Sequence, residues 1–319
     1  MKAAVVESYD RAPRYVEFAD PVAGDGEVLV NVTAAGLHPI VKALASGSHY
    51  GSTGELPFVA GVDGVGRRAD GSRVYFGVTR PPYGTFAERG VTRPAMCVPL
   101  PDGLDDVTAA ALANPGMSSR AALMRSQFVA GESILILGAT GTAGRLAVQI
   151  ARRLGARRIV CAGRNPATLE ELGGLGANAV ISLDQEPESL VERFREALDD
   201  SRIDVVLDYL WGQPAERLLD AIAQKGLSHA ARRIRFVQIG NSAGRTISLA
   251  AATLRSSGLE LLGSGFGSAS IEQILQAVGE LFREATKQPF QNAVKAIPLR
   301  ELEAYWNRQE EGARVVFLP

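Results

Sequence analysis

The chain has 319 residues, of which 46% are hydrophobic and 22% are charged, and its formal net charge is −1. This length exceeds the usual size of one domain, so we expect two. The near-neutral charge argues against a nucleic-acid or anionic-membrane partner, and no apolar run reaches the roughly 18 residues that a membrane-spanning helix needs.

Cysteine usage and the N-terminal sequence indicate where the protein works. Cys97 and Cys161 are the only cysteines and lie far apart in the sequence. They exclude a cysteine-built zinc site and give no disulfide framework. The sequence MKAAVVESYD becomes polar too early for a signal peptide and is typical of a strand. We therefore expect a cytoplasmic protein.

The first third of the chain is rich in short apolar runs that Gly and Pro interrupt, such as KAAVVES, EVLVNVTAAG and RVYFG. Period-2 alternation with frequent breakers predicts antiparallel strands in a barrel-like domain. Ala and Leu then recur at helical spacing over residues 105–128. They predict two helices, with a break at Asn114-Pro115-Gly116.

From residue 133 onward, buried strands alternate with amphipathic helices: SILILGA, GRLAVQIARRLG, RIVCAG, PATLEELGGLG, AVISL, PESLVERFREAL, DVVLDYL, PAERLLDAIAQKG and IRFVQIG. This alternation predicts a doubly wound parallel sheet, which LELLGSG near residue 260 extends by one strand. The tail predicts a helix, a strand, a helix over ELEAYWNRQEE and a last strand, ARVVFLP. We expect this last strand to rejoin the first domain.

The stretch ILILGATGTAGRLAVQIA places a turn of small residues between a buried strand and a helix. Ala139-x-Gly141-x-x-Gly144 is the dinucleotide fingerprint with Ala in place of its first Gly. Gly141 lets the backbone approach a diphosphate, Gly144 lets the helix pack on the strand, and the helix N-terminus favours the anion. We therefore predict a dinucleotide site at Ala139, Thr140, Gly141, Thr142, Ala143 and Gly144. A tight turn that binds no ligand is the alternative.

The next strand distinguishes the two nicotinamide dinucleotides. It ends in VCAGRNP and lacks the carboxylate that would hold the ribose 2′-hydroxyl of NAD. The Arg164 guanidinium matches a 2′-phosphate, Gly163 leaves room for it, and Asn165 follows. The sequence therefore predicts NADPH, and a solvated arginine at the start of the next helix is the alternative.

Six segments resemble, in this order, motifs of the zinc-independent quinone oxidoreductases (zeta-crystallin-like) of the medium-chain dehydrogenase/reductase superfamily. They are AAGLHPIVKALASG, LPFVAGVDGVGR, NPGMSSRAAL, LGATGTAGRLAVQIARRLGA, IGNSAG and GARVVFLP. The resemblance covers nearly the whole chain and implies an α/β protein of two domains. A GroES-like β-barrel catalytic domain is expected at residues 1–116 and 264–319, and a Rossmann domain at residues 117–263.

The same resemblance implies residues around the nicotinamide and its ribose: Met117, Ser118, Leu210, Ile239, Gly240 and Asn241. It also implies a homodimer, since relatives join their Rossmann sheets through the strand that corresponds to LELLGSG, and an apolar edge strand needs covering.

Zinc alcohol dehydrogenases are a competing group, because they share this architecture. Their Gly-His-Glu segment reads Gly61-Val62-Asp63 here, and Val62 cannot bind a metal. We therefore expect no metal ion. Without a Lewis acid, a quinone or an α,β-unsaturated carbonyl is an easier hydride acceptor than a simple ketone. An enoyl-thioester reductase and a non-catalytic NADPH-binding protein remain as alternatives.

His38 and Tyr50 are the candidate catalytic residues. His38 stands where the family has Asn, and its neutral imidazole could donate a hydrogen bond to the substrate carbonyl or the nicotinamide ribose. Tyr50 is the leading candidate for a proton donor, because related enoyl-thioester reductases place a Tyr near this position. His49 competes with it, and a spacer role for His38 and a surface role for Tyr50 are the alternatives.

Overall fold

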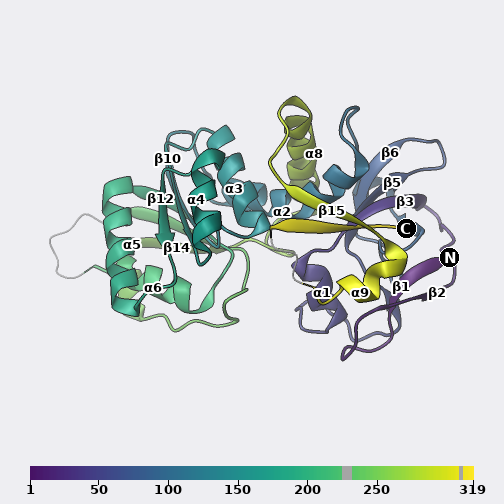
Figure 1. The fold of residues 1–319 in the computed structure, drawn as a ribbon, viewed down its shortest axis with the longest axis horizontal. Coiled ribbons are helices and arrows are strands. Elements are labelled where there is room, and N and C mark those ends of the chain that lie inside the picture. Colours follow the sequence, from purple (N-terminus) through teal and green to yellow (C-terminus); the bar gives the residue numbers. More distant parts are fainter. Residues whose placement is uncertain (225–231, 309–311) are drawn as a thin grey trace. The chain divides into compact units, whose positions relative to one another are not determined.

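The computed structural model describes residues 1–224, 232–308 and 312–319, and Figure 1 shows its course. The chain forms two compact units: a first unit of Met1–Met117 with Leu275–Pro319, and a second unit of Ser118–Ile274. The second boundary lies after residue 274, later than the residue 263 expected from the sequence. His229 lies outside the described residues.

The first unit contains a three-stranded sheet in the order β2-β1-β4 and a seven-stranded sheet in the order β15-β16-β3-β5-β6-β8, in which β7 also pairs with β3. Their bounds are β1 Lys2–Val6, β2 Arg14–Glu17, β3 Val28–Gly36, β4 Phe58–Val59, β5 Asp63–Arg67, β6 Arg73–Gly77, β7 Arg89–Thr92, β8 Cys97–Pro99, β15 Ala293–Pro298 and β16 Ala313–Leu318. The helices of this unit include α1 Pro39–Ala45 and α9 Leu302–Tyr305.

The last strand of the chain closes the first unit. β16 pairs antiparallel with β3 through Val316 opposite Gly36 and Phe317 opposite Ala35. The buried rings of Phe86 and Phe317 meet edge to face, with centroids 5.2 Å apart. The predicted return of the C-terminal strand to the first domain is confirmed.

The second unit is built on a six-stranded parallel sheet in the order β11-β10-β9-β12-β13-β14. The strands are β9 Ser133–Leu137, β10 Arg158–Gly163, β11 Ala179–Ser182, β12 Ile203–Asp208, β13 Arg233–Gln238 and β14 Gly258–Gly263. The helices are α3 Thr142–Arg153, α4 Pro166–Leu175, α5 Pro187–Ser201, α6 Gly212–Ile222 and α7 Ala251–Arg255. This strand order is that of a Rossmann domain, as predicted.

The expected break at Asn114-Pro115-Gly116 is wrong. One helix, α2, runs from Asp106 to Arg125 with Pro115 inside it. Proline removes one helical hydrogen bond, but Ala and Leu favour the helix on both sides. Residues 109–113 and 121–123 are also buried, so packing holds both halves.

Two short helices also differ from the prediction. The helix expected over residues 301–311 is the single turn of α9 after a 3₁₀ turn, Leu299–Glu301, and residues 309–311 lie outside the described ranges. Leu302 and Trp306 are its buried residues, and the polar residues that follow offer no apolar face to extend it. α7 was not predicted, because its five residues are too few to show helical periodicity.

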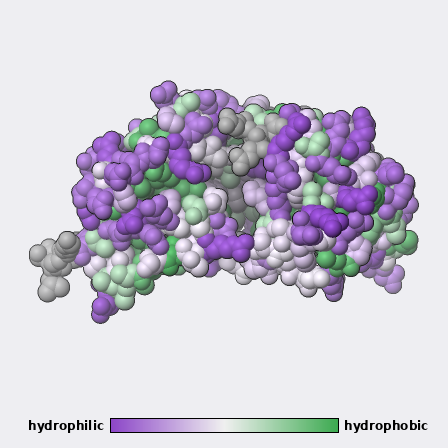
Figure 2. Space-filling model, turned by 60° about the horizontal axis from the view of Figure 1, so that its bottom comes forward, coloured by the Kyte–Doolittle hydropathy of each residue, from purple (hydrophilic) through white to green (hydrophobic). Residues whose placement is uncertain are grey.

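α8, Ile271–Lys287, is the first of the two helices expected in the tail, over SIEQILQAVGELFREATK. No helix in the described ranges is both long and apolar enough to cross a membrane. The face drawn in Figure 2 is mostly hydrophilic, with smaller hydrophobic groups between. Such a mixture is normal for a folded chain, since there is too little polar surface to cover it.

Candidate functional site

The loop between β9 and α3 is held against the neighbouring strand. The backbone N–H groups of Gly138 and Ala139 both donate to the carbonyl of Ala162 on β10, at 2.9 and 3.0 Å. Gly138 has a φ of +85°, a left-handed conformation that favours glycine, and α3 begins four residues later. The loop therefore leaves the sheet in a fixed direction, with the start of α3 next to the strand end.

The two glycines of the fingerprint have different roles: Gly144 permits a close backbone contact, and Gly141 leaves open space. A Cβ on Gly144 would lie 2.3 Å from the carbonyl oxygen of Gly138 and 2.5 Å from Cα of Ala139, so only glycine permits this approach of helix to strand. A Cβ on Gly141 would meet no atom nearer than 3.5 Å, and Gly141 is exposed. Because Gly141 makes no side-chain cap, the N–H groups of the first turn of α3 are available to an anion. The loop fits a dinucleotide diphosphate.

The other predicted nucleotide residues of the second unit gather at the same edge of the sheet. A Cβ on Gly163 would lie 2.4 Å from Cγ2 of Thr140, and one on Gly138 would lie 3.0 Å from Cδ2 of Leu210. These contacts join the loop to the ends of β10 and β12. The strand order reverses between β9 and β12, and parallel sheets bind ligands at such a point.

Asp208, at the end of β12, organises the turn that carries Leu210. Its carboxylate accepts hydrogen bonds from the backbone N–H groups of Leu210 and Trp211, at 2.8 and 3.0 Å. Burial raises the pKa of Asp208 to about 6, and these hydrogen bonds partly oppose that effect. Trp211 has a φ of +56°, which is costly for a side chain of this size. This role of Asp208 in the turn was not predicted from the sequence.

The main-chain carbonyl of Asp208 also accepts from the N–H groups of Ile239 and Gly240, at 2.8 and 3.1 Å. These bonds bring the end of β13 to the end of β12, and Asn241 follows on the exposed side. The residues expected around the nicotinamide ribose from β12 and β13 therefore share one edge of the sheet.

Tyr209 links this edge to the start of the second unit. Its hydroxyl lies 2.7 Å from Oγ of buried Ser119, and it also interacts with the Ser118 side chain. Burial raises the pKa of Tyr209 to about 12, so the phenol keeps its proton. Met117 precedes these serines, belongs to the first unit and is buried. Ser118 was predicted, whereas Ser119 and Tyr209 were not.

Arg164 and Asn165 follow β10 and are both exposed. The Asn165 side chain accepts a hydrogen bond from the N–H of Thr168 at 3.1 Å and caps α4. Asn165 therefore has a structural task, and its predicted contact with the cofactor stays a prediction. The Arg164 side chain is accessible to a ligand.

In the first unit, His38 is buried and only 1% exposed. Its Nε2 atom lies 3.4 Å from Oδ1 of Asp63, and Oδ2 of Asp63 accepts a hydrogen bond from the Tyr75 hydroxyl at 2.9 Å. Burial lowers the pKa of His38 more than the Asp63 carboxylate raises it. His38 is therefore a neutral imidazole at neutral pH.

Tyr50 lies in a different environment, in the loop after α1. It is 74% exposed, and its ring stacks on that of His49 with centroids 4.1 Å apart. Nδ1 of His49 accepts the N–H of Gly51 at 3.0 Å, and partial burial lowers the pKa of His49. The exposed phenol is accessible to a substrate, as a proton donor must be.

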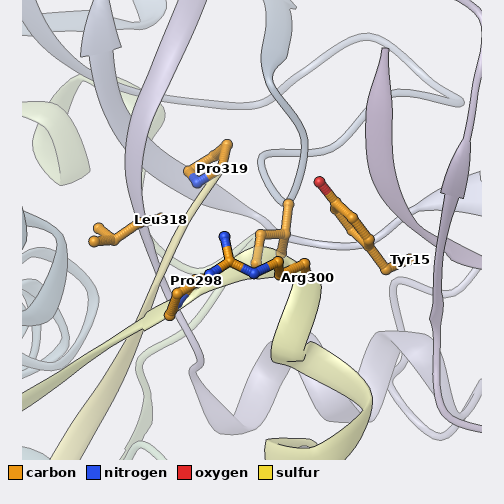
Figure 3. A pocket seen from close by; sticks show the side chains of 6 residues that line it. Tyr15, Pro298, Arg300, Leu318 and Pro319 are labelled. Carbon is orange, nitrogen blue, oxygen red and sulfur yellow. The ribbon is translucent and has the colours of Figure 1, made fainter.

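A pocket of about 240 Å³ lies elsewhere in the first unit, and Figure 3 shows it from close by. Its walls come from β2, the turn after β15 and the C-terminus: Tyr15, Pro298, Leu299, Arg300, Leu318 and Pro319. It is smaller than typical ligand pockets and includes no predicted site residue. Among the described residues, no group of three or more His, Cys, Asp or Glu side chains could hold a metal ion.

Comparisons with known proteins fit this arrangement. The model of the zinc-binding dehydrogenase family matches residues 143–281. The probable NADPH-dependent quinone reductase tdiC of Emericella nidulans is 29% identical over the whole of both chains. A polyketide synthase subunit of Mycobacterium tuberculosis is 32% identical over 67% of this chain, which spans only 10% of that much longer protein.

Among solved structures, the quinone oxidoreductase of Thermus thermophilus, also solved with NADPH, is 27% identical with a TM-score of 0.81 over the whole of both chains. The chain thus belongs to the medium-chain dehydrogenase/reductase superfamily, with its Rossmann and GroES-like domains. Within it, the chain belongs to the zinc-independent quinone oxidoreductases and is an oxidoreductase. The match to the zinc-binding family does not include Gly61-Val62-Asp63.

The two loop glycines predict a separation of stability from binding. We expect Gly144→Ala to lower the free energy of unfolding by about 1–3 kcal/mol, because its Cβ overlaps backbone atoms. Gly141→Ala should leave stability nearly unchanged but weaken dinucleotide binding, since its methyl group would occupy the open side. Denaturant unfolding and titration calorimetry measure the two effects, and equal losses of stability in both variants would contradict the account.

Proposed function

We propose that this protein is an NADPH-dependent, metal-free reductase that transfers a hydride to a quinone or an α,β-unsaturated carbonyl compound. The observation that carries the proposal is the loop of residues 138–144, closed on the sheet at Gly144 and open at Gly141. The NADPH-dependent relative and the NADPH complex of the Thermus protein support the choice of cofactor.

Within this proposal, the residues of the second unit bind and orient NADPH, which supplies the hydride. The loop holds the diphosphate through backbone N–H groups, and Arg164 holds the 2′-phosphate. Leu210, Ile239, Gly240 and Asn241 hold the nicotinamide and its ribose, together with Met117 and Ser118. The bond between Asp208 and the turn at Leu210 keeps this edge in place.

On the substrate side, the proposal assigns the chemistry to His38 and Tyr50. Val62 removes the histidine ligand of the zinc position in the related alcohol dehydrogenases. Without a metal ion, the acceptor has to delocalise the negative charge that develops on it. Quinones and enones do so by delocalisation, and the protein then positions the partners and supplies hydrogen bonds. Tyr50 is the proposed proton donor.

We also propose a homodimer and a cytoplasmic location. β14 is an edge strand of the six-stranded sheet, and Leu261 on it is 37% exposed, so a second copy would cover an apolar edge. Cys97 and Cys161 are free thiols, which suits a reducing compartment.

A second candidate is an enoyl-thioester reductase, because a stretch of a polyketide synthase subunit is 32% identical to this chain. It shares the cofactor and the hydride step with the first candidate and differs in the acceptor. A non-catalytic NADPH-binding protein would need the same dinucleotide loop but would reduce no hydride acceptor.

Arg164 should determine the preference for NADPH. We expect Arg164→Ala to raise the KM for NADPH by about ten-fold or more and to leave that for NADH unchanged, because only NADPH carries the 2′-phosphate. Arg152→Ala, which removes an exposed arginine from the other end of α3, is the control and should change neither. Equal efficiencies with both cofactors, unaffected by Arg164→Ala, would refute the assignment.

NADPH oxidation with a panel of 1,4-quinones, short enones and crotonyl thioesters tests the function itself. We expect turnover with quinones or enones, and a several-fold drop in kcat for enones in Tyr50→Phe. Turnover confined to the thioesters would favour the second candidate. Tight NADPH binding with no turnover on any acceptor would contradict both enzymatic assignments.

A further inference from the structure

Three polar side chains from separate segments of the first unit form a cluster with His38. Asp63 comes from β5, Tyr75 from β6 and Arg314 from β16, and His38 precedes α1. Burying such groups is costly unless they pair with one another, so a cluster of this kind needs a reason. None of the three partners of His38 has a role in the function proposed above.

The Asp63 carboxylate is fixed from one side. Tyr75 donates to Oδ2 at 2.9 Å, and burial raises the pKa of Tyr75 well above its usual value, so the phenol keeps the proton that it donates. Thr85 also donates its hydroxyl to the main-chain carbonyl of Asp63 at 2.7 Å. The carboxylate is thus anchored to the sheet, and Oδ1 faces His38.

The His38 ring is fixed from the other side. A Cβ on Gly36 would lie 2.5 Å from Nε2 and 2.6 Å from Cε1, so the ring lies directly over the last residue of β3. The backbone before it is held by Arg314, whose guanidinium donates to the carbonyl of Leu37 at 2.8 Å. The ring has little freedom to turn away from Asp63.

In this cluster, the charge of Arg314 balances that of the Asp63 carboxylate, and the His38 imidazole is neutral. Burial lowers the pKa of Arg314 to about 10, opposed by Asp63, so Arg314 is charged at neutral pH and balances the carboxylate. Burial and the charge of Arg314 lower the pKa of His38, and the ring is neutral. A neutral ring has one N–H and one acceptor nitrogen.

The two atoms that face each other decide which nitrogen carries the proton. Oδ1 of Asp63 and Nε2 of His38 are 3.4 Å apart and both are buried. Neither has a hydrogen-bond partner among the described residues in the arrangement shown. A proton on Nε2 lets a small shift close this contact into a hydrogen bond. A proton on Nδ1 would instead place a lone pair against a carboxylate oxygen.

We propose that Asp63 is a positioning residue, which fixes His38 as the tautomer protonated on Nε2 and leaves Nδ1 as a hydrogen-bond acceptor. Its use in the reaction rests on the proposed function, in which His38 meets the cofactor or substrate. Nδ1 is also buried and has no hydrogen-bond partner among the described residues, so a hydroxyl or amide N–H of either molecule reaches it only when binding opens this side of the ring. His38 accepts a hydrogen bond there instead of donating one as the sequence suggested, and the product proton comes from Tyr50 or water.

Nitrogen-15 NMR of histidine-labelled protein reads the tautomer directly. The chain has three histidines, so the variant His49→Gln/His229→Gln leaves His38 as the only signal. At neutral pH we expect Nε2 to give the shift of a protonated ring nitrogen and Nδ1 that of an unprotonated one. A protonated Nδ1, or a doubly protonated ring, would overturn the proposal whether or not any acceptor is reduced.

Asp63→Asn tests the cause of the tautomer. An amide can face the ring with its oxygen, which favours a proton on Nε2, or with its NH₂ group, which favours a proton on Nδ1. We therefore expect a mixture of the two tautomers, in which the nitrogen shifts of Nδ1 and Nε2 move toward each other. We also expect kcat to fall about ten-fold or more. Asp106→Asn is the matched control, since it removes another largely buried carboxylate of this unit, paired with Arg73, and should leave both shifts in place.

A second variant keeps the test valid if Asp63→Asn does not fold. Tyr75→Phe keeps the carboxylate and removes only the bond that orients it, so we expect a smaller movement of the same two shifts. Unchanged shifts in both variants would overturn the role of Asp63. If the shifts behave as expected but no acceptor is reduced by the wild-type protein, the proposed function fails and the tautomer assignment stands.

Discussion

The close approach of α3 to the end of β9 is the constraint on which the nucleotide site depends. Gly144 permits it, because any Cβ would overlap the backbone of Gly138 and Ala139. The approach directs the free N–H groups of the first turn of α3 to one point beside the sheet, where a diphosphate has both hydrogen bonds and a favourable dipole. Leu210 and Gly163 then surround that point through their contacts with the loop.

Much of this arrangement follows from local sequence. Glycines at 141 and 144 between a continuous apolar strand and an amphipathic helix predict the loop, because few other structures place these residues so. The strand order of the second unit follows from strand–helix alternation and the family resemblance together. The return of the last strand to the first domain was expected from the sequence of the tail, and the pairing of β16 with β3 confirms it.

The features that were missed depend on contacts between distant segments. Tyr209 and Ser119 are ninety positions apart, and nothing in either segment signals that they meet. In the sequence, Asp63 is only the residue that stands in place of the Glu of the Gly-His-Glu segment. The fold places its carboxylate between Tyr75 and His38. Pro115 was wrongly predicted to break the helix, because burial of residues 109–113 and 121–123 on both sides of it outweighs its local effect.

The two units divide the work in a way that suits a metal-free reductase. In the proposed reaction, the second unit binds the anionic cofactor through backbone N–H groups and Arg164, and the first unit contributes the neutral His38. The most direct test is deuterium transfer to an enone from NADPH deuterated at both C4 positions, with enzyme pretreated with a strong chelator. Direct hydride transfer without a metal ion gives one deuterium on the β-carbon of the product, at the same rate as with enzyme that was not treated with chelator. Product without the label, or activity lost on chelation and restored by zinc, would contradict it.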